Sequence, residues 1–459
     1  MQSVRHSWRR WAAVAASAAT VTAMLAACSG TPATSTPPAP DASPGQTAGG
    51  DPLDGSAITI GTYSPLAPQY EAWAAAYMKE FPNRKVEILP VSEDITKYQQ
   101  ILATQRISNT MPDLIFNVDF LANVFAQDDL VIDLAPMLAE GKDGLKTDSF
   151  VPQFLGQYRP LDAPDKVTGL PVSADSTALF WNKTLFDKAG VKEYPTENWT
   201  WDDYVRVAKE IQKKSDGAIF GATPPAEDGG SISYWGPVLL ASGAKVYDPA
   251  TNTVDINSPA AIEGWKKMFE FYPDGVPPYS AGGGGAWDIG SGKMAMGIGS
   301  TALVSATRES LKDYEWDVTR VPSINGKHPS GGGSYAFSIS ATSKNVDAAW
   351  AFLAWFYDPA KGSLVAQSAE GGNTIPPTLS GLEGGAWSES SVPANIKVFA
   401  QTAQDAQLMV AMPGSTQNVM TEATKQAFQE VLLNGADIQA AFDKAAETTN
   451  AALAEEAKK

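Results

Sequence analysis

The fold is decided by the stretch AITIGTYSPLAPQYEAWAAAYMKEFPNRKVEILP, which covers residues 57–90. Residues 57–60 predict a short buried strand that Gly61 ends. Five apolar side chains then recur at helical spacing and predict an amphipathic helix: Leu66, Tyr70, Trp73, Tyr77 and Phe81. Pro82 stops this helix, and residues 85–89 alternate as a second strand. Strands that alternate with helices predict a largely parallel α/β sheet.

The same alternation continues along the chain. Apolar residues around Tyr98 predict another helix, and residues 114–116 predict another strand. Thr200 and Asp203 form a capping-box pattern at the start of a further helix. From residue 57 to residue 459 this body has about 400 residues, which is more than one hydrophobic core usually supports, so two lobes are expected.

The N-terminus has the layout of an export signal. Arginines precede an uncharged stretch, residues 11–27, that is shorter than the ~20 strongly apolar residues of a membrane span. Residues 1–27 are therefore expected to be a secretory signal that directs export by the general route, with the twin-arginine route as the alternative because of the pair Arg9-Arg10. The signal ends in Leu25-Ala26-Ala27-Cys28, which resembles the lipobox of bacterial lipoproteins, and Cys28 is the only cysteine of the chain. The resemblance implies a lipid on Cys28; the alternative is an incidental small residue beside a cleavage site.

Residues 28–56 are rich in Ser, Thr, Pro, Ala and Gly. Such a stretch buries too little apolar area to offset its ordering entropy, so it predicts a flexible tether. With the lipid on Cys28, the body would stand at the outer face of the bacterial cytoplasmic membrane.

Composition argues against several classes of protein. The net charge of −17 at pH 7 disfavours a nucleic-acid partner, because phosphates attract basic surfaces. Beyond the signal the chain has one histidine, His328, and no cysteine except Cys28, so histidine-based triads and multi-histidine zinc sites lack their residues. We expect no metal, no cofactor and no enzymatic activity, with a carboxylate pair acting on a glycoside as the open alternative.

Six short segments stand out in the body, in this order: Met111-Pro112-Asp113-Leu114-Ile115-Phe116, Leu170-Pro171, Phe180-Trp181-Asn182-Lys183-Thr184-Leu185-Phe186, Thr200-Trp201-Asp202-Asp203, Ser291-Gly292-Lys293-Met294-Ala295-Met296 and Asn434-Gly435. Each one is a weak signal by itself. Together and in this order they resemble the family 1 extracellular solute-binding proteins of bacterial ABC importers.

The resemblance implies two α/β lobes that are joined by crossover strands and close on a ligand in the cleft between them. Lobe 1 is expected to hold residues 57–173 and 332–372, and lobe 2 residues 174–331 and 373–459. The implied partners are a small-molecule ligand and the permease subunits of an importer, and we expect a monomer. The ligand is expected to be a sugar or oligosaccharide; a peptide, a polyamine or an organic anion is the alternative.

Residues just past strand ends are the first candidates for ligand contact, because α/β sheets bind ligands beyond the carboxyl ends of their strands. Tyr63 and Ser64 follow the first strand, and Asn117 and Asp119 follow the strand at 114–116. An aromatic ring would cover an apolar sugar face, while polar side chains would bind its hydroxyls. The alternative role of Asp119 is a helix or turn cap.

Further candidates come from the expected crossovers. Asp175 and Ser176 fall where the first crossover should run, and Tyr335 follows the run of glycines at 331–333. The resemblance also implies a cleft aromatic at Trp235, for which core packing is the alternative.

Ser300 lies in Gly297-Ile298-Gly299-Ser300-Thr301-Ala302, which matches a loose dinucleotide-binding pattern. No acidic residue ends a following strand at the required distance, so we expect a loop and a helix start that border the cleft, with Ser300 as the helix cap and a ligand donor. Gly371, with its neighbours 372–373, and the pair at 412–413 are weaker candidates. We expect four side chains to converge on one cleft: Tyr63, Asp119, Trp235 and Tyr335.

Overall fold

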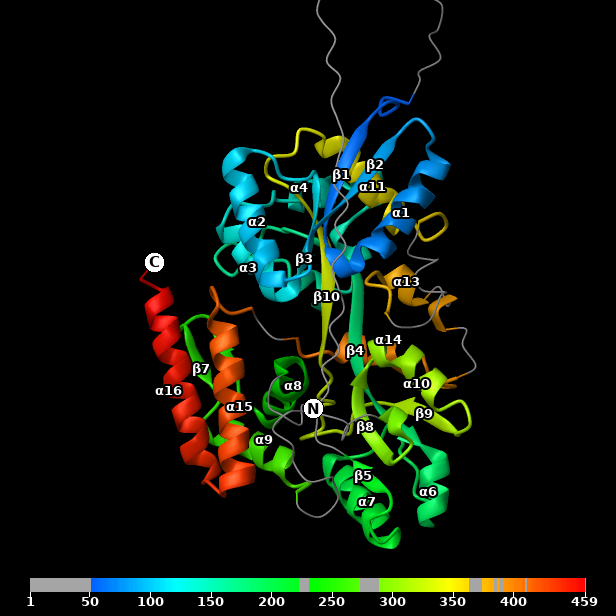
Figure 1. Ribbon diagram of the computed structural model, residues 1–459, viewed down its shortest axis with the longest axis vertical. Helices are drawn as coiled ribbons and strands as arrows, with labels where there is room; N and C mark the ends of the chain where they lie inside the picture. The colour runs from blue at the N-terminus through cyan, green and yellow to red at the C-terminus, as the bar shows by residue number, and fades with distance from the viewer. Residues whose placement is uncertain are drawn as a thin grey trace, which may run out of the picture. The chain divides into compact units, whose positions relative to one another are not determined.

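The computed structural model describes residues 51–222, 231–272, 289–362, 374–383, 386–388, 392–408 and 411–458 (Figure 1). The expected signal, Cys28 and the expected tether up to residue 50 lie outside the described residues, and so does Gly371 with residues 372–373. No helix in the described ranges is long and apolar enough to cross a membrane.

Three parallel strands form one half of the main sheet, with β1 in the middle: β1 (Ala57–Tyr63), β2 (Lys85–Ser92) and β3 (Leu114–Val118). Two helices connect them, α1 (Ala67–Glu80) and α2 (Ile95–Ser108). These elements were predicted, but β1 does not end at Gly61. The strand continues through it because a glycine lets the backbone approach Pro112, whose Cγ would lie 2.7 Å from an added Cβ.

Two neighbouring strands lead from this half of the sheet to the other (Figure 1). β10 (Gly332–Ile339) lies antiparallel to β3, and the long strand β4 (Leu170–Asn182) lies antiparallel to β10. Up to Ser176 the partner of β4 is β10, whereas from Thr177 onward it is β8 (Met294–Ser300). The two halves of the sheet therefore share β4, and its pairing changes slightly beyond the boundary expected after residue 173.

The second half of the sheet adds two short strands to β4 and β8: β5 (Phe220–Ala222) and β9 (Trp316–Thr319). A separate hairpin is formed by β6 (Val246–Asp248) and β7 (Thr253–Asp255). The helices of this part of the chain are α6 (Lys183–Ala189), α7 (Trp201–Lys214), α8 (Ile232–Ser242), α9 (Pro259–Phe269) and α10 (Val304–Ser310). The capping box of Thr200 and Asp203 at the start of α7 is confirmed.

The other α-helices in the described ranges are α3 (Asp119–Gln127), α4 (Ala135–Glu140), α5 (Pro152–Gly156), α11 (Val346–Tyr357), α13 (Leu379–Glu383), α14 (Val398–Asp405), α15 (Thr416–Asn434) and α16 (Ile438–Glu456). The last two lie side by side and pack on α9, where the ring of Trp265 stacks on Phe442 with centroids 4.1 Å apart (Figure 1). This contact joins the C-terminal helices to the core of the second half.

Separate hydrophobic cores support the two halves. The first contains Trp73, Phe337 and Phe356 beside β1, β3 and β10, and the second contains Trp235 and Trp265 beside α7 to α9, α15 and α16. A smaller third core lies around β4, β9 and α14. The predicted two-lobe α/β fold is confirmed.

The body begins earlier than the expected tether boundary at residue 56. The carboxylate of Asp51 forms an ion pair of 2.5 Å with Arg84, whose guanidinium lies 4.2 Å from the ring centroid of Phe81. The backbone N–H of Gly55 donates to the carbonyl of Asn83, so residues 51–56 are held against the first lobe.

Candidate ligand-binding site

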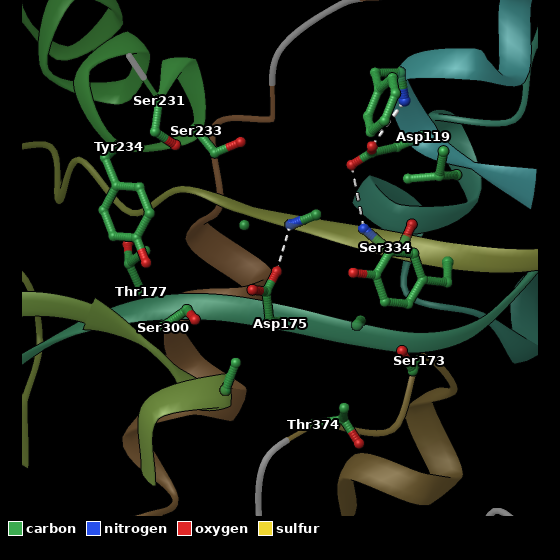
Figure 2. A pocket seen from close by; sticks show the side chains of 17 residues that line it. Asp119, Ser173, Asp175, Thr177, Ser231, Ser233, Tyr234, Ser300, Ser334 and Thr374 are labelled. Atoms are coloured by element: carbon green, nitrogen blue, oxygen red, sulfur yellow. Dashed lines mark hydrogen bonds between the residues drawn. The ribbon is translucent and has the colours of Figure 1, made fainter. Parts of the chain in front are cut away.

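A cavity of about 290 Å³ lies where β3, β4, β8 and β10 approach the start of α8 (Figure 2). This volume is near the lower end of the ~300–1,000 Å³ that small-molecule sites commonly have. The described residues that line it are Val118, Asp119, Phe120, Ser173, Ala174, Asp175, Thr177, Ser231, Ser233, Tyr234, Ser300, Ala302, Gly332, Gly333, Ser334, Tyr335 and Thr374.

The strands bring these residues together from distant parts of the sequence. Asp119 is the first residue of α3, directly after the carboxyl end of β3, where the helix macrodipole favours a carboxylate. Asp175 lies on β4 just before its change of partner, and Ser300 ends β8. Because β10 pairs with both β3 and β4, its residues from Gly332 to Tyr335 pass between the two aspartates.

Asp119 accepts three hydrogen bonds. Its Oδ1 accepts from the backbone N–H of Phe120 at 2.7 Å, and its Oδ2 accepts from the Ser334 backbone N–H at 3.2 Å and from Gln157 Nε2 at 3.0 Å. Burial raises the pKa of Asp119 to about 6, the negative charge of Asp175 adds to the rise, and the three donors oppose it. The carboxyl is therefore fixed in position, and its pKa of about 6 lies well above the usual value of an aspartate.

Asp175 is held by Gly333 of β10, the residue just before Ser334. Its Oδ1 accepts from the Gly333 backbone N–H at 2.7 Å, while burial raises the pKa of Asp175, opposed by hydrogen bonds from Gly333 and Ser300. A Cβ added to Gly333 would lie 2.7 Å from Asp119 Oδ2 and 3.7 Å from Asp175 Oδ1. A side chain at this position would therefore displace the Asp119 carboxylate, whereas its distance to Asp175 would be an ordinary van der Waals contact.

Aromatic rings form another part of the wall. Tyr335 is 43% exposed and its ring centroid lies 5.3 Å from that of Phe116, while Phe120 is 40% exposed. On the opposite side Tyr234 is half-buried, and burial raises the pKa of its hydroxyl, opposed by hydrogen bonding to Ser300. Exposed ring faces beside hydroxyls and carboxylates are suited to a solute with both apolar surfaces and hydrogen-bonding groups.

Four of the predicted site residues line this cavity together: Asp119, Asp175, Ser300 and Tyr335. Tyr63 does not line it, although its ring stacks at 6.1 Å on Phe116, which also contacts Tyr335. Ser64 begins the 3₁₀ turn after β1 and is likewise not among the lining residues. Contact of any of these side chains with a ligand stays a prediction.

Other predicted positions are structural. The side chain of Asn117 is buried between strands, where its Nδ2 donates to Ser338 Oγ at 3.0 Å, and the buried hydroxyl of Ser176 contacts the carbonyl of Phe399 at 2.9 Å. Met412 is buried in the second core. These side chains are buried within the sheet and the cores and do not line the cavity.

Trp235 was wrongly expected in the cleft. It is fully buried, and its ring lies 4.9 Å from that of Trp265 in the second core. The cavity is lined instead by Tyr234, which is adjacent in sequence and faces another side of α8.

Sequence reasoning also missed most of the small hydroxyl residues of the wall: Ser173, Thr177, Ser231, Ser233, Ser334 and Thr374. Serine and threonine are common in turns and caps, so their side chains gave no separate signal. A helix start at Ser231 and the glycines before Ser334 are the only sequence features that point toward two of them. In the described part of the chain, no group of three or more His, Cys, Asp or Glu side chains could hold a metal ion.

Comparison with known proteins identifies the type of protein. Residues 63–362 match the family described as bacterial extracellular solute-binding protein. A putative binding protein of Brucella abortus (strain 2308) is 25% identical over 312 residues, covering 65% of this chain and 71% of the relative. The galactooligosaccharide-binding protein of Bacillus subtilis (strain 168) is 28% identical over 299 residues, covering 62% of this chain and 65% of the relative.

A solved structure shows the same fold. The ABC substrate-binding protein Lmo0181 from Listeria monocytogenes, determined in complex with cycloalternan, superposes with a TM-score of 0.71 at 21% identity, covering 87% of this chain and all of that one. The family match extends over most of the body, and the shared two-lobe fold agrees with it. This chain belongs to the bacterial extracellular solute-binding protein family.

Proposed function

We propose that this protein is the solute-binding component of an ABC importer and that it binds a sugar or oligosaccharide between its lobes. The observation that carries this proposal is the cavity at β4 and β10, which is lined by the partly exposed Tyr335, by the carboxylates of Asp119 and Asp175 and by several hydroxyl side chains. A sugar offers apolar ring faces and hydroxyl edges, which are the complements of these groups.

The named relatives support the same ligand class. The Bacillus subtilis relative is a galactooligosaccharide-binding protein, and the Listeria structure holds cycloalternan. The place of the cavity also supports lobe closure, since Asp175 lies next to the point where β4 changes from one half of the sheet to the other. Closure about this strand would bury the ligand and present the closed form to the permease.

Export and anchoring belong to the same proposal. The family is extracellular by description, and the lipobox-like sequence ending in Cys28 supplies an acylation site ahead of the body. The protein would act as a lipid-anchored monomer at the outer face of the cytoplasmic membrane. Radiolabelled palmitate should be incorporated into the wild-type chain and not into Cys28→Ala.

A thermal-shift screen of the full chain tests the ligand class. Mono-, di- and oligosaccharides are compared with di- and tripeptides and with dicarboxylic acids. A ligand at about 100 times its dissociation constant should stabilise the protein by about 2.7 kcal/mol. Stabilisation by sugars that are recovered unchanged supports the proposal. Stabilisation only by a peptide or an acid would refute the sugar, and release of a hydrolysis product would show an enzyme.

A further inference from the structure

The candidate cavity has an unbalanced charge. Asp119 and Asp175 are its only charged side chains among the described lining residues, and no lysine, arginine or histidine is present there to offset them. The donors to the two carboxylates are neutral: the backbone N–H groups of Phe120, Gly333 and Ser334, the amide of Gln157 and the hydroxyl of Ser300. The described part of the site therefore holds up to two negative charges without a cationic side chain beside them.

The two carboxylates are close enough to act on one ligand. Both contact the same short piece of β10, and both have an oxygen within 4 Å of the position that a Cβ on Gly333 would occupy. Figure 2 shows Asp119 and Asp175 on either side of this strand, with labelled hydroxyl residues such as Ser300 and Ser334 nearby. A group that enters beside β10 would therefore meet both charges together.

Lobe closure makes this charge more costly. When water leaves a closing cleft, carboxylates that have no cationic partner lose their hydration. Neutral hydroxyl groups replace this hydration only in part. A positive charge on the solute would offset both carboxylates and would be attracted more strongly in the dehydrated site than in water. An anionic solute would add a third negative charge.

We propose that the solute is an amine-bearing sugar, an amino sugar or basic glycoside whose protonated nitrogen is held between Asp119 and Asp175. This inference rests on the proposed sugar-binding function and specifies its substrate class. The sugar ring lies against Tyr335, and the ammonium group also gains from the exposed aromatic faces of Tyr335 and Phe120. Uronic acids are rejected.

Matched sugar series test the proposal on the full chain at pH 7 by isothermal titration calorimetry. Glucosamine is compared with glucose, N-acetylglucosamine and glucuronate, and galactosamine with the corresponding galactose series. The disaccharide of β-1,4-linked glucosamine is compared with cellobiose, and spermidine serves as an amine without a sugar ring. Within a series that binds, the amine should bind about tenfold more tightly than the neutral and acetylated members, and the uronate most weakly.

Variants separate the effect of the two cavity carboxylates on amine preference from the effect of the protein's overall charge. Asp119→Asn and Asp175→Asn should each reduce the preference for the amine over the neutral sugar severalfold. Glu447→Gln removes one negative charge on the exposed side of α16, far along the chain from the cavity residues, and should leave the preference unchanged. Melting curves of each variant establish that it is folded.

The outcomes distinguish the inference from the proposed function. Equal or tighter binding of a neutral sugar or a uronate, or an amine preference that survives both aspartate substitutions, overturns the inference and leaves sugar binding in place. Spermidine binding more tightly than every sugar, or no binding in any series, overturns both.

Discussion

Tyr234 and Trp235 are consecutive residues of α8 that face opposite surroundings. Tyr234 lines the cavity at the crossover strands, whereas Trp235 is fully buried against Trp265. One step along a helix turns the side chain by about 100°, which is enough to move from the core to the cavity wall. The start of α8 therefore links the packing of the second lobe directly to the geometry of the site.

This arrangement predicts that the two residues have separable effects. Trp235→Phe should lower the free energy of unfolding by about 2 kcal/mol, because it leaves unfilled volume in the core, while a bound ligand keeps its affinity. Tyr234→Phe should leave stability nearly unchanged and weaken ligand binding, because it removes a hydroxyl beside Ser300. Urea unfolding and calorimetry measure the two effects, and a reversed pattern would place Trp235 at the ligand.

Gly333→Ala is predicted to weaken ligand binding about tenfold. The new methyl group would meet Asp119 Oδ2 at 2.7 Å, so this carboxylate must move away from the Ser334 backbone N–H that holds it. Gly156→Ala is the matched control, since an added Cβ there has no neighbour within 4 Å. Calorimetry should show the loss in the first variant alone; equal affinities in both would mean that the carboxylate position is unimportant.

The raised pKa of Asp119 predicts a pH dependence of stability. The folded protein holds this proton up to a pH of about 6, whereas the unfolded chain releases it near 3.8, so the folded state binds more protons in between. The contribution of Asp119 to the free energy of unfolding is therefore most favourable at low pH and is lost as the pH rises through 6, by on the order of 3 kcal/mol.

Urea unfolding from pH 4 to pH 7.5 checks this dependence against Asp119→Asn, which does not titrate. The difference in unfolding free energy between wild type and variant should change with pH up to about 6 and level off above that. Ligand affinity should show the opposite trend, because the charged carboxylate is the better acceptor and the better partner for a cation. A constant difference in stability would mean that Asp119 has an ordinary pKa.

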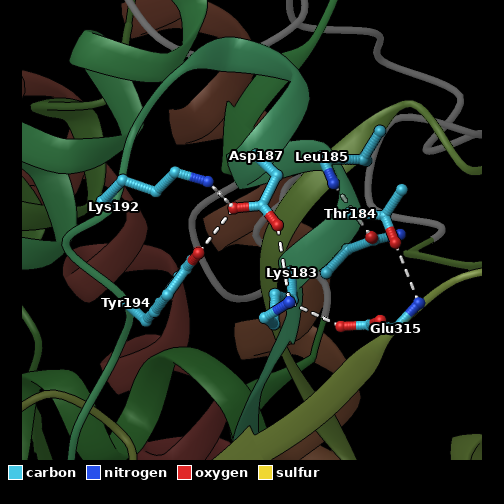
Figure 3. Close-up of polar contacts among 8 residues, drawn as sticks. Lys183, Thr184, Leu185, Asp187, Lys192, Tyr194 and Glu315 are labelled. Atoms are coloured by element: carbon cyan, nitrogen blue, oxygen red, sulfur yellow. Dashed lines mark hydrogen bonds and ion pairs between the residues drawn. The ribbon is translucent and has the colours of Figure 1, made fainter.

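A surface network around Asp187 predicts a separate effect in acid. Its carboxylate accepts hydrogen bonds from Lys183 Nζ at 3.4 Å, from the Tyr194 hydroxyl at 2.5 Å and from the ammonium group of Lys192 (Figure 3). Lys183 also contacts Glu315 Oε2 at 2.5 Å, which ties α6 to the residue just before β9. Hydrogen bonds from Lys192 and Tyr194 are the main causes that lower the pKa of Asp187 to about 2.

Because this pKa is lowered, the contribution of Asp187 to stability is present at neutral pH and is lost as the pH falls from about 4 to about 2. Asp187→Asn should therefore reduce the melting temperature at pH 7 and narrow the gap to wild type in acid. Asp358→Asn, at the end of α11, is the control because no ion pair is formed by that carboxylate in the described chain. A difference in melting temperature between the Asp187 variant and wild type that stays constant as the pH falls would contradict the lowered pKa of Asp187.

The sequence alone determined the α/β character of the first lobe and several helix starts. These depend on local physics: apolar spacing fixes α1 between β1 and β2, and Thr200 with Asp203 fixes the start of α7 through bonds three residues apart. The length of the body indicated two lobes for a similarly simple reason, the limit on what one core can bury. Four predicted residues line the cavity: Asp119 was predicted because it follows a strand, Asp175 because it lies on an expected crossover, and Ser300 and Tyr335 because they follow glycine-rich runs.

Only the tertiary structure decided which candidates meet. The register of β10 against β3 and β4 brings Gly333 and Ser334 to Asp175 and Asp119, and no local pattern encodes pairing over such separations. Trp235 packs against Trp265 in the core, and as a result the neighbouring Tyr234 lies in the cavity wall. Periodicity within a segment specifies its own conformation, whereas a site built from four strands and a helix end exists only after long-range pairing has fixed their register.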